Sequence, residues 1–465
     1  MPTSIESSVN KICDEWQKRQ GALSIVFPIE GKTIQDPIHG PIEIEPELVF
    51  LLDSVMMQRL RRISQLGLAN LVFPGANHTR LEHSLGVMHI VGRILARIKK
   101  DQRLNDNDIL EAKAAALLHD IGHLPFSHVP EPLLALNSSI RKESQAENIK
   151  PSELLTTKII QSDLMKSIFE ILNKKSKTSH LDAKNVASQA VGNAPLNNPQ
   201  RMFLGEISHG DFDADRMDYL MRDAHYSGCP LGTLDVERLV RATTVSKGSG
   251  GIKSLAMDIK GLHALESMIV ARSVMYSVVY FHHAVRAANG MLLRAIHSKF
   301  KTNPLNLLRY DDHSLISYIR TDPEAGQFVE KLESRALFKT SVRLTTKDAL
   351  NQPALMDFVN KANIGSVVAD EGSINKKVRN DNRKHCIIDM PPIEIYSEID
   401  FNIREILPKG EKVNPIRSYS SIAKGVEDDA ELKWRGYVFG PQAEVKKVRE
   451  TALDYLQSKG LSFNL

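Results

Sequence analysis

The sequence predicts a mainly α-helical protein with small β-hairpins and an α+β C-terminal part. Residues 46–66 and 81–98 carry apolar side chains three or four positions apart, the spacing of helices with one buried face. Residues 34–45 instead form two short extended pieces around a Pro/Gly turn, which predicts a β-hairpin. Short alternating apolar runs near the C-terminus predict strands before a final helix at 442–458.

The other elements follow in chain order. A helix is predicted at about 107–120, because its apolar run is followed by Gly122 and Pro125, which end helices. The polar stretches 137–152 and 174–200 predict loops or partly ordered insertions. The later predictions are a helix at about 214–227, two strands around a Ser/Gly-rich turn in 236–259, a long helix at 261–300, and strands within 387–403 and 434–440.

Composition excludes several classes of protein. The net charge of +4 is too small for a general nucleic-acid binder, but it allows a local basic pocket for a small anion. No run approaches the ~18 apolar residues of a membrane span. The three cysteines form no CxxC pair, and we see neither a secretory signal nor a lipidation motif. These features predict a protein of the reducing cytoplasm.

The histidines are clustered. Six of the 16 fall between residues 78 and 128, where an even spread would place roughly two. The pair His119-Asp120 ends a predicted helix, His83 lies near the start of the preceding one, and an acidic segment follows at 211–215. A His-Asp pair alone occurs by chance, but a His, His-Asp, Asp set on three helices suits a divalent metal of borderline or hard character.

Three longer segments extend this pattern: HTRLEHSLGV at 78–87, HDIGHLPFSH at 119–128 and FDADRMDYLMRDAHYSG at 212–228. They resemble the metal-site segments of HD-domain deoxynucleoside triphosphate triphosphohydrolases, the dNTPases and dGTPases, which include a mammalian enzyme with an added sterile-alpha-motif domain. The similarity begins at DPIHG, passes through QRLRRISQLG and VFPGANHTR and ends at YFHHAVRAANGML, so it covers most of residues 32–300. We therefore expect an HD-domain helical fold, without a sterile-alpha-motif domain.

The resemblance implies an activity and a set of site residues. Members of this family hydrolyse dNTPs to deoxynucleoside and inorganic triphosphate with a divalent metal, here Mg, Mn, Fe or Zn. The positions matching metal ligands are His83, His119, Asp120 and Asp215. Those matching catalytic residues are His123, His128, Glu153 and again Asp215. Those matching substrate contacts are Gln65, Leu66, Arg80, Glu131, Arg216, Tyr219, Asp223, Arg272 and Tyr280.

One position departs from the family pattern. Ser152 stands where relatives usually carry a histidine with an acid–base role, and a serine hydroxyl does not act as an acid near neutral pH. Either Glu153 with His123 suffices, or another histidine takes this role, or the chemistry is weakened or altered. The alternatives are therefore an HD-type nucleotidase or phosphodiesterase, and a catalytically weakened nucleotide sensor or nucleic-acid-binding protein.

Several residues keep a purely structural alternative. His123 and His128 would then be loop histidines, and Tyr219 and Asp223, four positions apart, would share a solvated helix face.

A second set of positions concerns assembly and regulation. In tetrameric relatives the matching residues form a nucleotide-activated site between subunits; they are Lys32, Asp53, Gln58 and Arg61, with Arg417 and Lys424 from the C-terminal part. We therefore expect a homo-oligomer, with a tetramer favoured, and a GTP or dNTP effector, whereas binding of single-stranded nucleic acid is not favoured. The expected organisation is an N-terminal segment at 1–31, an HD-type catalytic domain at 32–305 and a C-terminal accessory or oligomerisation region at 306–465.

Overall fold

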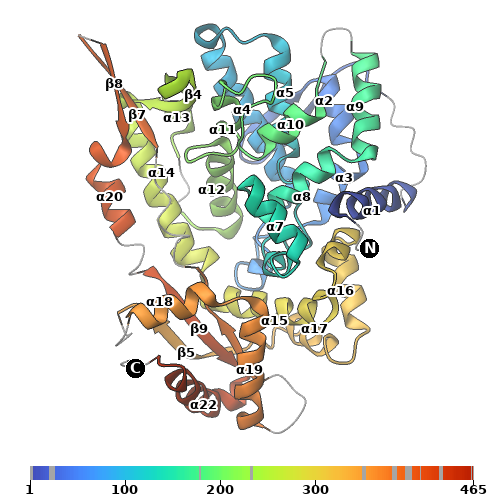
Figure 1. Ribbon diagram of the computed structural model, residues 1–465, viewed down its shortest axis with the longest axis vertical. Helices are drawn as coiled ribbons and strands as arrows, with labels where there is room; N and C mark the ends of the chain where they lie inside the picture. The colour runs from blue at the N-terminus through green and yellow to red at the C-terminus, as the bar shows by residue number, and fades with distance from the viewer. Residues whose placement is uncertain are drawn as a thin grey trace.

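The computed structural model describes residues 4–19, 27–176, 180–230, 234–347, 352–379, 385–392, 401–408, 410–428, 433–461 and 463. The predicted fold class is confirmed: helices dominate, and the strands form three small sheets. Figure 1 shows a large helical body with a smaller unit built on a sheet below it. The four-stranded sheet lies at one side of the body, beside α14 and α20 (Figure 1).

The N-terminal elements include the predicted hairpin. Strand β1 pairs with β2 from Lys32 with Ile44 to Asp36 with Gly40, and the turn needs a glycine because Gly40 has a φ of 72°. The bounds of these elements are α1 Ile5–Arg19, β1 Lys32–Asp36, β2 Gly40–Ile44, α2 Pro46–Leu52, α3 Val55–Arg59, and the 3-10 turns η1 Leu60–Arg62 and η2 Ala69–Leu71.

The single helix predicted over 46–66 is wrong. It is divided after Asp53, because the Ser54 side chain accepts a hydrogen bond from the Met57 backbone N–H at 3.5 Å and so begins a new helix. The apolar spacing continues across this break, which is why the pattern alone did not reveal it.

The body is built around two neighbouring helices, α4 and α5, both of which the sequence predicts, with α12 packed beside α4. Most of the apolar side chains of α4 and α5 are buried in one large core that also includes α1, α8 and α15. The bounds are α4 Arg80–Gln102, α5 Asp106–Leu118, α6 Glu131–Leu134, α7 Ser138–Glu147, α8 Pro151–Ile160, α9 Asp163–Lys175, α10 Ala183–Ala190, α11 Phe203–Glu206 and α12 Ala214–Ser227.

The polar stretches 137–152 and 174–200 are not simply loops. The first holds α7, whose start is capped by the Asn137 side chain and whose Ile140 is fully buried. The second holds α10, which Asp182 caps and whose Val186 is fully buried. A cap and a few buried residues suffice for these short helices, although their composition is polar; residues 177–179 lie outside the described residues.

Two further predictions change in the middle of the chain. Residues 236–242 form helix α13 and not a strand, because Asp235 caps it and Val236, Leu239 and Val240 bury one helical face. The predicted hairpin is confirmed only for β3 and β4. The bounds are α13 Val236–Ala242, β3 Thr243–Lys247, β4 Lys253–Asp258, α14 Leu262–Met275 and α15 His283–Phe300, with 3-10 turns η3 Ser249–Gly251 and η4 Ile259–Gly261.

The long helix predicted at 261–300 is interrupted between α14 and α15. Residues Tyr276–Tyr280 form a π-helical turn, and the His282 side chain then accepts from the Ala284 N–H at 3.3 Å to begin α15. Such turns often occur at functional sites. Here the turn brings the Tyr280 hydroxyl to the Asp223 carboxylate, to which it donates at 2.7 Å.

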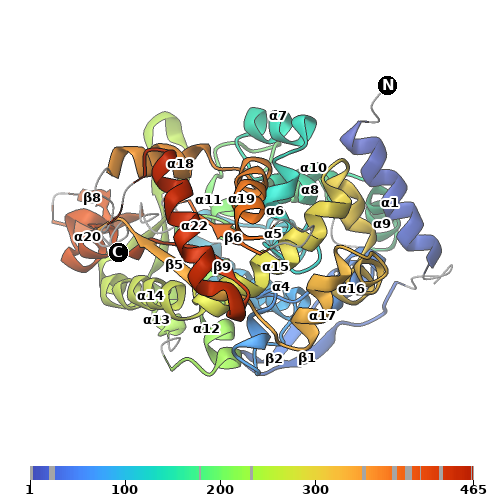
Figure 2. The same cartoon turned by 90° about the horizontal axis from the view of Figure 1, so that it is seen from below.

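The C-terminal residues contribute to two cores. Helices α16 and α17 and strand β7 pack into the large core, whereas β5, β6, β9, α18, α19 and α22 enclose a second one. Figure 2 shows α22 lying across the β5-β9-β6 sheet. The bounds are η6 Pro304–Arg309, α16 Asp312–Arg320, α17 Gly326–Glu333, β5 Lys339–Thr345, α18 Gln352–Lys361, α19 Ile364–Val378, β6 Ile387–Asp389, β7 Asn402–Leu407, β8 Gly410–Pro415, η8 Ile416–Ser418, α20 Ser421–Asp428, β9 Arg435–Gly440, η9 Gln442–Glu444 and α22 Val445–Ser458.

The strands predicted within 387–403 are found in part. Strand β6 lies at its start and β7 begins at Asn402, while residues 393–400 lie outside the described residues. The predicted strand at 434–440 and the final helix at 442–458 correspond to β9 and to η9 with α22.

No single helix in the described part of the chain is long and apolar enough to cross a bilayer. Two helical segments, Ile259–Tyr280 and His283–Phe300, meet the length and composition criteria only as a pair bent by 61°. Leu265, Met291 and Ile296 of this pair are buried in the large core.

A buried ion pair joins the second core to the body, and its loss is expected to destabilise the protein. Arg294 of α15 bonds both carboxylate oxygens of Glu371, and Glu371 also accepts from the Ile388 N–H at 2.8 Å. We expect Glu371→Ala to lower the free energy of unfolding by about 3–5 kcal/mol, because Arg294 is left buried without its carboxylate. Chemical denaturation measures this change.

The control for this prediction is Asp357→Ala, which removes the exposed pair of Asp357 with Lys361. An exposed pair of this kind contributes ~0.5 kcal/mol or less. Equal losses in the two variants would contradict the prediction.

Candidate metal and phosphate site

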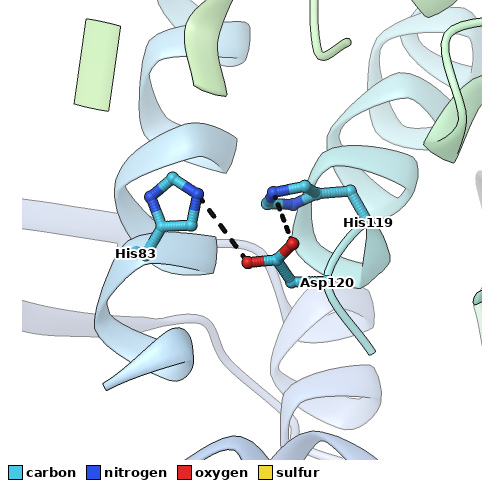
Figure 3. Close-up of side chains that lie close together, drawn as sticks. All are labelled: His83, His119 and Asp120. Carbon is cyan, nitrogen blue, oxygen red and sulfur yellow. Dashed lines mark ion pairs between the residues drawn. The ribbon is translucent and has the colours of Figure 1, made fainter. Parts of the chain in front are cut away.

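The predicted metal ligands converge from three helices. His83 lies in the first turn of α4, His119 and Asp120 directly follow α5, and Asp215 lies in the first turn of α12. The ligand atoms of His83, His119 and Asp120 all lie within 4.8 Å of one another (Figure 3). The Nε2 atom of His83 is 2.8 Å and that of His119 4.0 Å from Asp215 Oδ1, which places Asp215 beside this trio.

Local contacts explain why each ligand stands where it does. Glu82, the residue before His83, accepts a hydrogen bond from the Thr79 N–H at 2.6 Å through its side chain. This bond fixes the start of α4. The Thr156 hydroxyl of α8 donates to the His119 carbonyl at 3.0 Å and accepts from the Gly122 N–H at 3.1 Å. Asp213 caps α12 by accepting from the Arg216 N–H at 2.7 Å. The chain therefore fixes the backbone at all three ligand positions.

A buried network fixes the orientation of His83. Its Nδ1 donates to Asp218 Oδ2 at 2.8 Å, so the proton stays on Nδ1 and Nε2 faces the other ligands. Asp218 is fully buried and also accepts from Arg222 Nε and Nη2, each at 2.9 Å, and from His39 Nε2 at 2.6 Å. Arg222 in turn donates to Asp36 at 2.9 Å. Residues of the hairpin motif DPIHG therefore support a ligand on α4.

The donor set fits a divalent metal. His83 Nε2 and His119 Nε2 are buried and face carboxylate oxygens, Asp215 Oδ1 at 2.8 Å and Asp120 Oδ1 at 3.3 Å, and His119 Nδ1 is turned to the Ala116 carbonyl at 2.8 Å. Two imidazole nitrogens and two carboxylates are ligands suited to Zn, Fe or Mn, and less so to Mg, which prefers oxygen. Coordination to a divalent cation would hold these nitrogens and carboxylates around one positive charge.

Charges at the site shift the pKa values in opposite directions. Burial alone would lower the pKa of His83, but the hydrogen bonds and charges of Asp215 and Asp218 outweigh it and raise the pKa from 6.5 to about 10. Burial would raise the pKa of Asp120, but the Arg80 guanidinium and the neighbouring histidines hold it well below its usual range. Without a metal, His83 is therefore protonated at neutral pH and Asp120 is ionised.

The turn after Asp120 has an unusual backbone. Phe126 and Ser127 have φ angles of 60° and 56°, a conformation that costs non-glycine residues of order 1–2 kcal/mol each. Asp312 of α16 accepts from the Phe126 N–H at 2.7 Å, and the Ser127 hydroxyl donates to the Ser64 carbonyl at 2.5 Å. Arg80 Nε donates to Ser127 Oγ at 2.8 Å. These bonds hold the turn against the metal ligands.

A second group of residues lies beside the trio. His128 Nδ1 is 3.0 Å and His123 Nδ1 3.8 Å from the Glu131 carboxylate, and a ligand atom of each lies within 4.8 Å of the others. Arg80 connects the two groups, since it donates to Asp120 at 2.7 Å and lies 3.1 Å from His128 Nε2. Burial and the Arg80 charge lower the pKa of His123 to about 4, so His123 is neutral at pH 7. Burial would raise the pKa of Glu131, but the charge and hydrogen bond of His128, together with His123 and a hydrogen bond from Ser152, hold it well below its usual range.

The sequence analysis missed one histidine at the site. His209, in the turn between α11 and α12, places Nε2 3.1 Å from the Glu153 carboxylate. A nitrogen of His209 also lies within 4.8 Å of carboxylate oxygens of Asp213 and Asp215. Burial would lower the pKa of His209, but the bond to Glu153 outweighs it and raises the pKa. Its only signal in the sequence was its place four residues before Asp213, since Glu153 is far away in the chain.

The residues expected to contact the sugar and base are partly linked to one another. Asp223 accepts from Tyr280 at 2.7 Å and lies at the same distance from His78 Nε2. It is 2% exposed, so it does not lie on a solvated helix face as the structural alternative required. Tyr219 and Tyr280 stand edge to face with centroids 6.3 Å apart, and Arg272 hydrogen-bonds Tyr219.

Gln65 and Leu66 follow the 3-10 turn η1. The Gln65 backbone N–H donates to the His78 carbonyl at 3.0 Å, which places this pair beside the loop that begins α4, and its side-chain Oε1 is buried without a partner. Arg216 lies in the first turn of α12 next to Asp215, and its guanidinium donates to the Asp211 carbonyl.

The expected effector residues are only partly together. Lys32 Nζ lies 3.2 Å from Asp53, and Arg61 donates to Gln58 at 2.7 Å, all near the hairpin and α3. Arg417 lies on η8 and Lys424 on α20, and Figure 1 shows α20 on the opposite side of the body from α3. Within one chain, the two sets do not meet.

Histidines and aspartates from three helices meet here, beside Arg80 and a histidine-rich group. This site in a helical HD domain is that of a metal-dependent phosphohydrolase. The HD domain family matches residues 80–223, and the HD associated region matches residues 234–460. The chain is 31% identical over 425 residues to MJ1154 of Methanocaldococcus jannaschii. This matched region covers 90% of this chain and 81% of MJ1154. The chain belongs to the HD-domain family.

Other relatives are similar over a shorter region. YwfO of Bacillus subtilis is 36% identical over 58% of this chain and 56% of its own length. The human deoxynucleoside triphosphate triphosphohydrolase SAMHD1 is 31% identical over 57% of this chain and 44% of its own length. The chain thus spans about half the length of these two proteins. A crystal structure of a hypothetical protein from Aquifex aeolicus superposes with a TM-score of 0.67 and 28% identity, covering 91% of this chain and all of that one.

Asp218→Asn is expected to weaken metal binding without removing a ligand. The amide keeps the shape but not the charge that orients His83, and such supporting groups are typically worth about ten- to a hundredfold in metal affinity. Metal titration followed by elemental analysis measures the change. The control, Asp101→Asn, alters an exposed aspartate paired with Arg97 and should leave the metal affinity unchanged. A metal affinity in Asp218→Asn equal to that of the unaltered protein would contradict the prediction.

Metal binding is also expected to release a proton from His83. Because the pKa of His83 without metal is about 10, its Nε2 lone pair is available only in a small fraction of molecules at neutral pH. Raising the pH from 6 to 8 therefore increases this fraction and tightens metal binding by about tenfold per pH unit. Calorimetry in buffers of different ionisation enthalpy measures the released proton, and a pH-independent affinity would contradict this expectation.

Proposed function

We propose that this protein hydrolyses dNTPs to deoxynucleoside and inorganic triphosphate in a metal-dependent reaction. The observation that carries the proposal is the convergence of two buried histidine nitrogens with Asp120 and Asp215, directly beside Arg80. The similarity to deoxynucleoside triphosphate triphosphohydrolases of vertebrates, at 25–32% identity, supports it.

The residues of the site have distinct proposed tasks. A divalent metal ion held by His83, His119, Asp120 and Asp215 supplies a Lewis acid and lowers the pKa of bound water. Arg80 and His128 face the phosphates, and a guanidinium there grips two phosphate oxygens at once. The low pKa of His123 leaves its ring neutral and able to accept a proton at pH 7.

The sugar and base are proposed to lie toward Gln65, Leu66 and the tyrosines. The pair Gln65-Leu66 abuts the deoxyribose and excludes a 2′-hydroxyl. Tyr280 is held by Asp223, and Arg272 is held over the Tyr276 ring at 4.9 Å, so both present fixed surfaces to a nucleotide. Arg216 completes the basic side of the pocket from α12.

Regulation is proposed to act between subunits. Because Arg417 and Lys424 are remote from Lys32 and Asp53 within one chain, a GTP or dNTP bound to both sets would have to bridge two copies. Effector binding would then be coupled to assembly of a homo-oligomer, a tetramer in the proposed form.

Product analysis with each dNTP tests the proposed activity. The metal-loaded protein is incubated with a single dNTP and Mg²⁺ or Mn²⁺, with and without GTP, and the products are separated by chromatography. We expect deoxynucleoside and tripolyphosphate, and we expect Asp120→Asn to reduce turnover by at least about a thousandfold, because it removes an anionic ligand.

Other products identify the alternatives. Monophosphate with pyrophosphate, or turnover of cyclic dinucleotides or deoxynucleoside monophosphates without triphosphate release, would indicate a phosphodiesterase or nucleotidase. Tight nucleotide binding without turnover across metals and effectors would indicate a sensor, the alternative that Ser152 favours.

A further inference from the structure

A second histidine–carboxylate pair, besides His128 and Glu131, lies close to the expected metal ligands. His209 Nε2 faces Glu153 at 3.1 Å, and the two residues come from different parts of the body, the turn before α12 and the first turn of α8. About a third of the His209 side chain is exposed, at 31%, so the ring is accessible to a ligand.

The pair is held firmly in place. Glu153 accepts from the Lys150 N–H at 2.8 Å, and the His209 N–H donates to the Gly205 carbonyl at 3.1 Å. Gly192 packs against the backbone of His209 so closely that a Cβ there would stand 2.3 Å from the His209 carbonyl oxygen. The ring position is therefore set by backbone contacts and by Glu153 together.

His209 is close to the metal ligands without being placed as one of them. A nitrogen of His209 lies within 4.8 Å of oxygens of Asp213 and Asp215. Asp213 is already engaged, because its two oxygens accept from the Arg216 N–H at 2.7 Å and from the Gly210 N–H at 2.8 Å. Asp213 thus acts as a helix cap, and these three residues do not form a second metal site.

The orientation of His209 points to a hydrogen-bond donor for a ligand. Because Nε2 donates to Glu153, Nδ1 is the nitrogen that remains for a bound molecule, and it donates to a phosphate oxygen when the ring carries both protons. The neighbouring position on α8 is Ser152, whose side chain bonds Glu131 and carries no ring. His209 therefore pairs with a carboxylate of α8, whereas His128 pairs with Glu131 of α6.

We propose that His209, oriented by Glu153, binds a phosphate oxygen of a polyphosphate at the metal centre. This rests on the proposed function for the position of the triphosphate, and it adds a substrate-binding residue from a turn that the sequence pattern did not indicate.

Calorimetric titration of the metal-loaded, full-length protein with inorganic tripolyphosphate tests this role. We expect His209→Ala to bind tripolyphosphate about ten- to a hundredfold more weakly, the usual effect of losing one hydrogen bond to a charged group. His209→Gln, which keeps a side-chain N–H, is expected to lose less of the tripolyphosphate affinity than His209→Ala. The affinity of Glu153→Gln is expected to lie between that of His209→Gln and that of the unaltered protein. Metal content and unfolding midpoint are measured for every variant.

The matched control is His263→Ala. His263 is also paired with a glutamate, Glu266 at 2.9 Å, but its side chain is 92% exposed on α14, so this variant should bind tripolyphosphate normally. If dNTPs are hydrolysed, His209→Ala should raise KM more than it lowers kcat, because the contact is made to the ground-state phosphates as well.

Three results would overturn the proposal. The first is an unchanged tripolyphosphate affinity in both His209 variants. The second is loss of the metal in His209→Ala, because His209 would then be a metal ligand. The third is no binding of tripolyphosphate by the unaltered protein. The proposed function fails separately, when no dNTP yields triphosphate, because tripolyphosphate binding is measured without turnover.

Discussion

The hydrogen bond from His83 Nδ1 to Asp218 Oδ2 is the contact on which the rest of the site depends. Asp218 receives further hydrogen bonds from Arg222 and His39, so its charge is fixed and fully buried. It thereby ties α4, α12 and the N-terminal hairpin together at one carboxylate. The network also requires Gly86 on α4, because a Cβ there would stand 1.9 Å from Asp218 Oδ1. One helix thus supplies a ligand and the space for its support.

Much of the fold could be predicted from the sequence where a helix buries one continuous face. The apolar spacing of α4, α5 and α12 is unbroken, and these helices were predicted close to their observed bounds. Errors arose where a single side chain decides the backbone. Ser54 begins a new helix within an apolar pattern, and Asp235 begins α13 in a segment that was predicted as a strand. Caps of this kind change a boundary without changing the periodicity.

The same difference applies to the site. His83, His119 and Asp120 stand in segments whose order along the chain is itself informative, so their convergence was predictable. The pair of His209 with Glu153 was not, because it joins two turns that only the packing of α8 against the body brings together. Supporting residues such as Asp218 carry no separate pattern either, since they share their helix with the residues that contact the ligand.

The near balance of positive and negative charge in the sequence extends to the interior of the protein. Arg80, Arg222 and Arg294 are all buried, and each bonds a carboxylate. Arg80 differs from the other two because its guanidinium also reaches Ser127 and His128. It therefore links Asp120, the proposed metal ligand, to the group beside it through three fixed contacts. A polyanion that enters there meets a cation already oriented by the protein, and no side-chain freedom has to be lost on binding.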